Sequence, residues 1–500
     1  MVIQLVFIAL TSLMLITISH YSNRKELVFT LKTSGYILLG LLVYLLHLQG
    51  LIDETSTILG LAFTFLSYLI SLYSAEYTSI LGYEKPFEVS MEFFLITIVL
   101  TYIAPTFLLF VVAWTLSEIL GFIVIRKGEE HSLEGPLTSS RGFILTSTLT
   151  YEISIFTLIA LAFMITVGNL GLSMLNTPFN SMQGFLEVPI YIMPLILIGF
   201  IAKTANIPLH FWLPSAHSSA PSPGSAALSG LMVSLGYYGL YRILGIAKID
   251  HQREIIAYAF LVLALFTLIY GGLQSINQRD VKKMLAYSTI ATNGYVSLLF
   301  AMHVFYPSTV TWWAFILGIL MHAAYKTTLF CEAGLIEIAY GTRYIHGVRG
   351  IIKDMPLSTF GGVLATLSLL GLPGTVGFLS KLLAFLVALT LITMNSFFAT
   401  ATVISIMSYV ILSALIALRY ARVYFGASSL KTFTSTRAIP RGIQTPVMLM
   451  GLTNSAFALL VLQQFSLEIG LLLIAALAFS IMALYIVYSY FKAYSVRVTS

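Results

Sequence analysis

The sequence predicts an all-α polytopic membrane protein with about 14–15 transmembrane helices. The chain has 500 residues, of which 58% are hydrophobic and only 9% are charged, whereas soluble globular domains carry about 25% charged residues. Apolar runs such as residues 184–202 and 394–416 are longer than the roughly 18 residues that a membrane helix needs. Because an α-helix satisfies its own backbone hydrogen bonds in lipid, a bundle of helices is the expected fold.

Apolar runs and helix-breaking residues divide the chain into about fifteen expected spans. These spans are residues 2–20, 28–51, 56–76, 89–103, 105–125, 142–168, 187–216, 224–246, 255–276, 283–303, 309–340, 356–395, 398–425, 445–466 and 468–491. The first span has no small-residue cleavage site after it, so we expect a retained membrane helix and not a signal peptide.

Basic residues predict the orientation of these spans, because Lys and Arg accumulate in the inward connections of membrane proteins. With the N-terminus outside, inward connections hold twenty of the 26 Lys and Arg residues, Lys32 among them, and outward connections hold three. The last three, Lys203, Lys326 and Lys381, lie at membrane depth. This distribution explains the net charge of +6, and we expect no nucleic-acid partner.

Two long spans, residues 187–216 and 356–395, are interrupted by proline and glycine. Paired interrupted helices in two halves of a chain are typical of transporters built from inverted repeats. The expected organisation is therefore three N-terminal helices, a first five-helix repeat, a second five-helix repeat and two C-terminal helices. The corresponding residues are 1–88, 89–250, 251–426 and 427–500.

The three lysines at membrane depth need a reason, since a charge at the bilayer centre costs on the order of 3 kcal/mol. Each could extend to an interface or neutralise a structural carboxylate. Alternatively, they form a relay of protonatable groups, because a lysine removed from water can release its proton near neutral pH when a carboxylate tunes it. Two of the three lie beside interrupted helices, which favours the relay.

Acidic residues at membrane depth are few. Glu118, near the middle of span five, is the expected partner of Lys203, and Glu152 in span six is a second candidate. Glu92 and Glu187 lie near helix starts, where a carboxylate favours the positive end of the helix dipole. The remaining acids at depth are Glu332 and Glu337.

Cofactor chemistry is not expected in this chain. The single cysteine, Cys331, excludes an internal disulfide, a four-thiolate iron–sulfur site and a structural zinc site. We expect no cofactor and no metal, so any electron carrier or other driver must lie on other chains.

Four stretches resemble one known family. They are residues 203–226, beginning Lys-Thr-Ala-Asn-Ile-Pro-Leu-His; residues 280–289, Asp-Val-Lys-Lys-Met-Leu-Ala-Tyr-Ser-Thr; residues 322–330, His-Ala-Ala-Tyr-Lys-Thr-Thr-Leu-Phe; and residues 371–381, Gly-Leu-Pro-Gly-Thr-Val-Gly-Phe-Leu-Ser-Lys. They resemble the signatures of the proton-conducting antiporter-like subunits of respiratory complex I, Mrp-type sodium/proton antiporters and membrane-bound hydrogenases. The resemblance covers roughly residues 55–425, in family order.

The resemblance implies a fourteen-helix core with two inverted five-helix repeats. It also implies that Lys203 is the lysine of the first broken helix, that His322 and Lys326 form the central relay, and that Lys381 is the terminal proton-exchange residue. With Glu118 these are the candidate relay residues. Secondary candidates are His210, His217, Lys282, Glu152 and Ser234.

Three features depart from the family pattern. The usual acid on helix five directly follows the tryptophan, where this chain has Thr115, and Glu118 comes three residues later. Many members carry a lysine where this chain has Ser234. The long lateral helix of the distal complex I subunit is not expected, which favours a shorter prokaryotic module in the cell membrane.

The expected function is proton translocation in a complex I-related respiratory or hydrogenase complex. The expected partners are further antiporter-like subunits and a peripheral redox arm with iron–sulfur proteins. An Mrp-like sodium/proton antiporter subunit is an alternative, as is the membrane partner of an inorganic-carbon uptake protein. A non-conducting scaffold is a fourth possibility, against which the three intramembrane lysines argue.

Overall fold

The computed structural model describes residues 2–22, 24–130, 138–166, 177–425 and 437–462. Regular structure in these ranges is helical, and the only β pairing found in them consists of isolated bridges. The chain divides into two compact units, Met1–Ile256 and Ala257–Ser500. The expected span at residues 468–491 lies outside the described residues.

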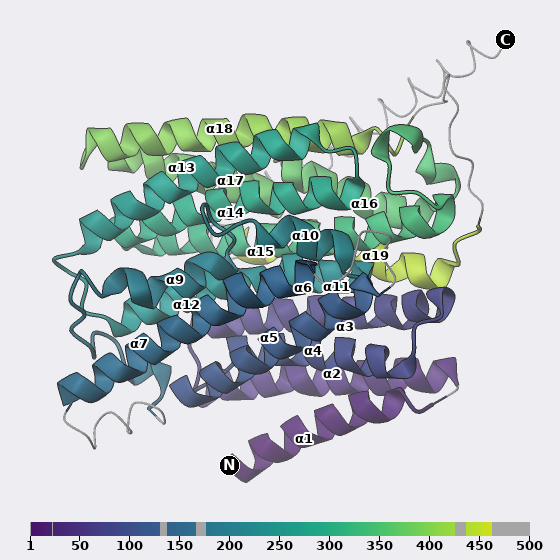
Figure 1. The fold of residues 1–500 in the computed structure, drawn as a ribbon, viewed down its shortest axis with the longest axis horizontal. Coiled ribbons are helices and arrows are strands. Elements are labelled where there is room, and N and C mark those ends of the chain that lie inside the picture. The colour runs from purple at the N-terminus through teal and green to yellow at the C-terminus, as the bar shows by residue number, and fades with distance from the viewer. Residues whose placement is uncertain (1, 23, 131–137, 167–176, 426–436, 463–500) are drawn as a thin grey trace. The chain divides into compact units, whose positions relative to one another are not determined.

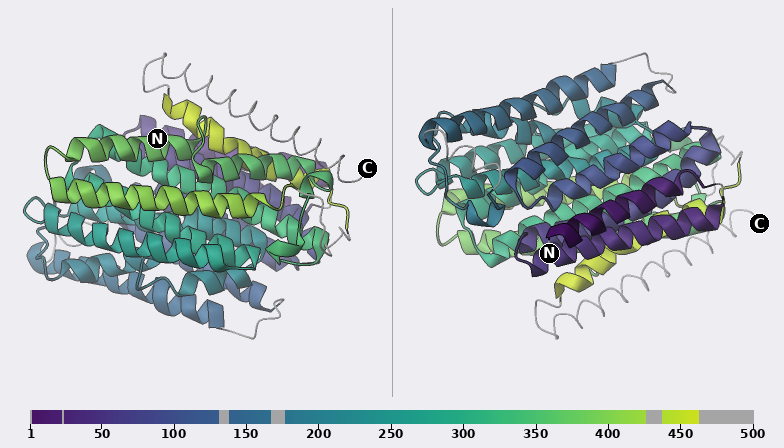
Figure 2. Two further views of the ribbon diagram at one scale, coloured as in Figure 1. Left: turned by 90° about the horizontal axis from the view of Figure 1, so that it is seen from above. Right: turned by 90° about the horizontal axis from the view of Figure 1, so that it is seen from below.

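The first unit is a bundle of elongated helices (Figure 1). They are α1 (Val2–Ser19), α2 (Lys25–Leu48), α3 (Glu54–Leu81), α4 (Lys85–Tyr102), α5 (Phe107–Glu129), α6 (Thr138–Phe143), α7 (Leu149–Thr166), α9 (Met193–Lys203), α10 (Trp212–Ser219), α11 (Ser222–Ala227) and α12 (Val233–Ile246). A π-helical turn, η1 (Ile144–Thr148), joins α6 to α7, and a second, η3 (Leu228–Met232), joins α11 to α12. Helix α1 packs along α2, as Figures 1 and 2 show (Figure 1, Figure 2).

The second unit is organised around one buried helix. Its helices are α13 (Arg253–Asn277), which begins just before the division, α14 (Val281–Phe305), α15 (Thr309–Tyr340), α16 (Pro356–Leu370), α17 (Val376–Leu391), α18 (Ser396–Ala421) and α19 (Arg441–Leu462). Helix α15 packs against α14, α16, α17 and α19. The most apolar stretch of this 32-residue helix is entirely buried, which makes it the core of the unit.

Length, composition and surface identify a multi-pass membrane protein. Seven helices in the described part of the chain are long and apolar enough to cross a membrane. Large apolar side chains also cover the outside, for example Phe156 at 76% exposure, Met164 at 80% and Phe397 at 71%. A surface of this kind is suited to lipid or to other membrane subunits. The membrane fold predicted from composition is thus confirmed, while the arrangement into inverted repeats stays a prediction.

The two expected interruptions are present. Residues 204–211 separate α9 from α10, and residues 371–375 separate α16 from α17. In the second break Gly371 has φ +86°, a left-handed conformation that glycine adopts without steric penalty. The first broken span starts later than expected, at Met193 and not near residue 187, because Pro189 begins a turn and Pro194 occupies the first turn of α9.

Two expectations about charged residues were wrong. Lys32 does not belong to an inward connection, because it lies within α2 with 1% of its surface exposed. Glu92 is buried on α4 and pairs with Lys32, with its Oε2 2.7 Å from Nζ, so its main partner is a side chain and not the helix dipole. The carboxylate makes burial of the lysine tolerable, and this pairing could not be inferred from either residue's distance to a helix end.

A second ion pair connects α12 to the start of α3. Asp53 caps α3 by accepting a hydrogen bond from the Ser56 backbone nitrogen, and its two oxygens each lie 2.6 Å from a guanidinium nitrogen of Arg242. Burial by itself raises the pKa of Asp53, but Arg242 outweighs it and holds the pKa below the ordinary value. Bidentate pairs of this kind fix geometry as well as charge.

Candidate functional site

A buried ion pair between α5 and α9 is the first part of the candidate site. Lys203, the last residue of α9, places Nζ 2.6 Å from Oε1 of Glu118 on α5, and neither side chain is exposed. The predicted pairing of these two residues is therefore confirmed. Thr115, at the position where the resemblance predicts an acid, is half-buried and its hydroxyl lies 3.4 Å from Oε1 of Glu152. The shift to Glu118 thus places the carboxylate on the buried face of α5.

The π-helical turn η1 supplies hydroxyl groups to this pair. Ser147 Oγ lies 3.3 Å and Thr148 Oγ1 3.1 Å from Oε2 of Glu118, and Lys203 Nζ donates to Ser147 Oγ at 3.2 Å. From α5 itself, Trp114 Nε1 donates to Glu118 Oε1 at 3.0 Å. Both carboxylate oxygens therefore accept hydrogen bonds, which is the condition under which a buried charge is tolerated. Single π turns in α-helices are common at functional sites.

Aromatic rings complete the surroundings of Lys203. Nζ lies 4.9 Å from the centre of the Phe143 ring and 5.9 Å from that of Trp212, within the range of cation–π attraction. Trp212 opens α10 after the break and donates its Nε1–H to the Ala202 carbonyl at 3.0 Å. The residues that follow the break therefore pack against the end of α9, next to Lys203.

Lys326 is buried without a carboxylate partner among the described residues. Its Nζ contacts the Leu285 carbonyl oxygen and Ser288 Oγ of α14, both at 2.5 Å. The rings of Tyr325 and Phe330 lie 5.1 and 5.8 Å from Nζ. An ammonium group held by neutral dipoles in a dry interior gives up its proton more readily than one paired with a carboxylate.

Lys381 contacts the end of α16 at the second helix break. Its Nζ donates to the carbonyl oxygens of Leu369 and Leu370, at 2.7 and 3.1 Å, and to Ser413 Oγ of α18 at 2.8 Å. Leu369 and Leu370 end α16, so the lysine lies at the negative end of that helix dipole. Gly371 has no Cβ, which leaves room for the aliphatic part of the lysine side chain.

A row of hydroxyl groups lies between Lys326 and Lys381 in the second unit. Thr292 Oγ1 is 2.5 Å from Tyr325 Oη and 3.1 Å from Tyr409 Oη, and it donates to the Ser288 carbonyl at 2.9 Å. Lys326 contacts Ser288, and Lys381 Nζ lies 5.3 Å from the centre of the Tyr409 ring. We call Ser288, Thr292, Tyr325 and Tyr409 the hydroxyl chain. Lys326 thus meets the hydroxyl chain through a hydrogen bond to Ser288, and Lys381 meets it through the face of the Tyr409 ring.

The candidate histidines occupy different settings. His322 is fully buried on α15, one turn before Lys326, and its ring centre lies 6.0 Å from that of Tyr325. His217 is buried on α10, and His210 is half-buried in the break before it. His322 is therefore positioned beside the hydroxyl chain, and the other two lie near the first break.

The other secondary candidates are spread over the chain. Lys282, near the start of α14, has Nζ 3.1 Å from Oε2 of Glu337 at the end of α15, so it belongs to an ion pair at the helix ends. Ser234 is buried on α12, with Oγ 3.4 Å from the Gly230 carbonyl. Glu152 is exposed on the outside of α7. The contacts described for these three side chains are with groups other than Lys203, Lys326 and Lys381.

Glu332 is a buried acid that was noted in the sequence but not selected as a site residue. Its Oε2 accepts hydrogen bonds from Tyr420 Oη at 3.0 Å and Tyr424 Oη at 2.9 Å, whereas Oε1 has no hydrogen-bond partner among the described residues. Gly362 on α16 packs directly against the carboxyl group, where a Cβ would collide with it. A carboxyl group that is buried without a cation favours its protonated form. The sequence feature that could have identified Glu332 as a site residue is its position on α15, six residues after Lys326.

The fold and these side chains define a class: a polytopic membrane protein that keeps lysines and carboxylates in its interior, as ion-translocating proteins do. The described residues contain no group of three or more His, Cys, Asp or Glu side chains that could hold a metal ion. The transmembrane family described as NADH:quinone oxidoreductase/Mrp antiporter matches residues 104–408. The chain belongs to this family, which confirms the resemblance seen in its motifs.

Curated relatives agree with this assignment over part of their length. The chain is 28% identical over 379 residues to the putative antiporter subunit mnhA2 of Staphylococcus haemolyticus, covering 73% of this chain and 46% of that protein. It is 35% identical over 191 residues to NADH-quinone oxidoreductase subunit M of Rickettsia prowazekii, covering 38% of each. The chain thus spans less than half the length of these relatives.

Solved structures share the fold. A chain of the Mrp complex from Dietzia sp. DQ12-45-1b aligns with a TM-score of 0.73 at 18% identity, covering 91% of this chain and 93% of that one. A chain of the membrane-bound sulfane sulfur reductase, an archaeal respiratory membrane complex, aligns with a TM-score of 0.72 at 17% identity, covering 90% and 75%. At these identities the likeness establishes architecture alone.

Proposed function

We propose that the chain is a proton-translocating, antiporter-like membrane subunit of a complex I-related respiratory or hydrogenase complex. The observation that supports this most is the burial of Lys203, Lys326 and Lys381, each held by a different set of polar groups. Retaining three ammonium groups in an apolar interior is costly, and such residues in membrane proteins mark ion pathways.

The three lysines differ in a way that suits stepwise transfer. Lys203 has a carboxylate partner, Lys326 has a carbonyl and a hydroxyl, and Lys381 has the end of a helix. The proton affinity of each therefore responds differently to a change of charge at its neighbour. Moving one charge through 100 mV involves about 2.3 kcal/mol, which corresponds to less than two pKa units at about 1.4 kcal/mol per unit.

The hydroxyl chain and His322 would carry protons between Lys326 and Lys381. A hydroxyl group can accept one proton while it donates another, so hydrogen-bonded hydroxyls pass protons without becoming permanently charged. The pair Glu118–Lys203 would gate this transfer by alternating between a closed ion pair and separated charges.

The expected test is proton pumping by the assembled complex in sealed vesicles. Lys203→Ala, Lys326→Ala and Lys381→Ala should each lower the pumping rate, because each removes one protonatable group. Lys248→Ala is the matched control, since Lys248 is exposed and pairs with the exposed Glu187. Wild-type pumping in all three variants of the buried lysines would contradict the proposal.

The setting of the chain is part of the proposal. We infer a prokaryotic cell membrane with the N-terminus outside, further antiporter-like subunits alongside, and a peripheral arm with iron–sulfur proteins. Cys331 is buried, so single cysteines introduced elsewhere report orientation. Lys85→Cys should react with an impermeant thiol reagent only from inside, and Lys248→Cys only from outside. Labelling of both from one side would overturn the inferred orientation.

An Mrp-like sodium/proton antiporter subunit is the second candidate. It is supported by the 28% identity to a putative antiporter subunit over 73% of this chain and by the fold shared with a chain of an Mrp complex. A pH jump across vesicle membranes that contain the complex, measured with and without Na⁺, separates the two functions. Sodium-dependent proton movement would favour the antiporter, and sodium-independent pumping favours the first proposal.

A further inference from the structure

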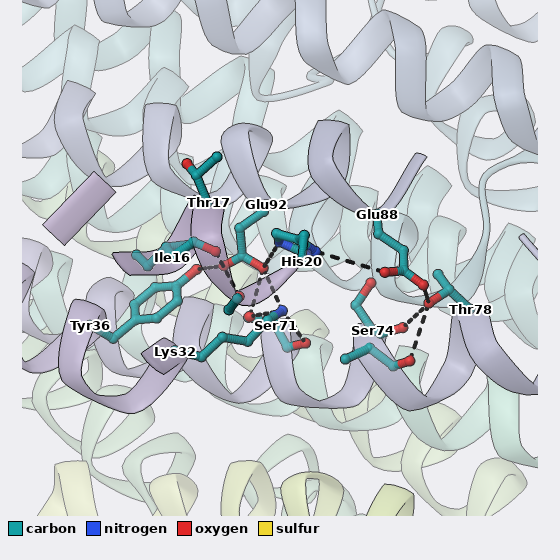
Figure 3. Close-up of polar contacts among 12 residues, drawn as sticks. Ile16, Thr17, His20, Lys32, Tyr36, Ser71, Ser74, Thr78, Glu88 and Glu92 are labelled. Carbon is teal, nitrogen blue, oxygen red and sulfur yellow. Dashed lines mark hydrogen bonds and ion pairs between the residues drawn. The ribbon is translucent and has the colours of Figure 1, made fainter. Parts of the chain in front are cut away.

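A second cluster of charged side chains lies among the N-terminal helices, outside the family match at residues 104–408. It consists of His20, Lys32, Glu88 and Glu92, with Tyr36, Ser71 and Thr78 around them (Figure 3). His20 follows the end of α1, Lys32 lies on α2, and the two glutamates lie one turn apart on α4. None of these residues belongs to the translocation site proposed above.

The inner half of the cluster is a fully satisfied ion pair. Glu92 Oε2 accepts from Lys32 Nζ at 2.7 Å and from Ser71 Oγ at 2.8 Å, and Glu92 Oε1 accepts from Tyr36 Oη at 2.6 Å. Lys32 and Glu92 each lie seven residues into their helices. At 1.5 Å per residue this is about 10 Å along the helix axis. The pair is therefore well below the helix ends.

His20 bridges the two glutamates. Its Nδ1 lies 3.7 Å from Oε2 of Glu88 and its Nε2 lies 3.5 Å from Oε2 of Glu92, so one ring nitrogen faces each carboxylate. Figure 3 shows the ring between them. An imidazole placed in this way can take a proton on one nitrogen and release one from the other.

Exposure decreases along the same order. The Glu88 side chain is 22% exposed, whereas His20 is 5%, Glu92 4% and Lys32 2% exposed. Glu88 is also held by Thr78 near the end of α3, through a hydrogen bond of 2.8 Å between Oγ1 and Oε1. The cluster thus leads from a partly open carboxylate at the helix ends to a closed ion pair inside.

The charge count indicates that the cluster takes up a proton. Two carboxylates and one lysine leave a net charge of −1 when His20 is neutral, and a protonated His20 brings the net charge to zero. Charged and titratable groups that face the cluster are Lys32 and Tyr36 from α2, Glu88 and Glu92 from α4, and His20. Helix α3 contributes the hydroxyl groups of Ser71 and Thr78. Because Glu92 is already paired with Lys32, the second carboxylate of the count is Glu88, and His20 is the group that faces it.

We propose that His20, Glu88, Glu92 and Lys32 form a proton-binding site that holds one exchangeable proton and takes it, through Glu88, from the membrane face at which α1 and α3 end. The site does not depend on the function proposed above, because a chain can bind a proton here whether or not it conducts. Burial by itself lowers the pKa of His20, but its contacts with Glu88 and Glu92 outweigh this effect and raise the pKa above its ordinary value.

Infrared difference spectroscopy of the full chain in its complex, recorded between mildly acidic and mildly alkaline pH with isotope-labelled histidine and glutamate, tests the proposal. In the wild type we expect one histidine and its neighbouring carboxylates to change together across the titration. Glu88→Gln removes the uncompensated charge, so His20 should then stay neutral and the histidine signal should be lost. His20→Gln should shift the proton to a carboxyl group and create a protonated carboxyl band.

Glu26→Gln is the matched control, because Glu26 is an exposed acid on α2 and should leave the titration unchanged. Glu88 lies in the first turn of α4 and His20 directly follows α1, so their variants keep the inner pair of Lys32 and Glu92 and should fold. Wild-type difference spectra in both Glu88→Gln and His20→Gln would show that the cluster only fastens helices, and would overturn the proposal. In Lys203→Ala, a titration of the cluster like that of the wild type together with lost proton pumping would support a proton-binding site that is independent of the proposed function.

Discussion

Removing one partner of the Glu118–Lys203 pair should destabilise the protein far more than removing both. The two side chains are completely buried and Nζ lies 2.6 Å from Oε1. Removing one member of such a pair leaves an uncompensated buried charge, which costs about 3–5 kcal/mol. Lys203→Met alone should therefore lower the free energy of unfolding by about this amount. Glu118→Gln alone should have a similar effect, because the ammonium group then lacks its counter-charge.

The double variant Glu118→Gln/Lys203→Met should recover most of the lost stability. Replacing both members of a buried pair removes both charges, so no uncompensated charge is left in the interior. The assay is unfolding in mixed detergent micelles with increasing dodecyl sulfate, followed by circular dichroism. The same double variant should fail in proton pumping, which separates the functional role of the pair from its effect on folding.

The surface pair Lys127–Glu130 on the same helix is the matched control. Its Nζ–Oε2 distance of 2.8 Å is similar, but the two side chains are 40% and 46% exposed. Solvent screens exposed pairs, which contribute little to stability, so Lys127→Met should leave the unfolding transition nearly unchanged. If Lys203→Met and Lys127→Met changed the free energy of unfolding equally, burial could not be the reason that the inner pair matters for stability.

Two further predictions concern stability. Gly362→Ala should destabilise the protein by about 1–3 kcal/mol, because the added Cβ would collide with the Glu332 carboxyl group. Glu332→Gln should keep the tyrosine hydrogen bonds and destabilise the protein less. Unfolding of both variants in detergent checks this, and an unchanged stability of Gly362→Ala would contradict it. The pKa of Asp53 is lowered in the fold by Arg242, so the pair contributes stability above the unfolded-state pKa of about 3.9 and loses it as pH falls through the folded value. Asp53→Asn should therefore reduce stability at neutral pH and remove this acid-dependent part, and unchanged stability at neutral pH would count against the pair.

The sequence was informative where a single residue type is expensive in a membrane. Lys203, Lys326 and Lys381 stand out because few charges occur at depth, and Glu118 is the nearest acid on a helix that can face Lys203. The two helix breaks are visible as well, since proline and glycine interrupt long apolar runs at Pro208 and Gly371. These features are local, so one sequence is enough to find them.

Features that depend on contacts between distant helices could not be predicted. Lys32 lies seven residues after the start of its helix, where a lysine normally extends to the interface, and its partner is 60 residues away. The π turn that turns Ser147 and Thr148 toward Glu118 has no sequence signature in a polar stretch of this kind. Tyr409 is one of 28 tyrosines, and only packing shows that it belongs to the hydroxyl chain.

The number of protons moved per turnover tests the central claim most directly. Proton uptake and turnover of the assembled complex are measured together in sealed vesicles, for the wild type and for Lys326→Met. If the buried lysines carry protons, the variant should keep turning over while moving fewer protons in each cycle. An unchanged ratio of protons to turnovers in Lys326→Met would show that the ammonium group in the centre of the second unit has no part in proton transfer.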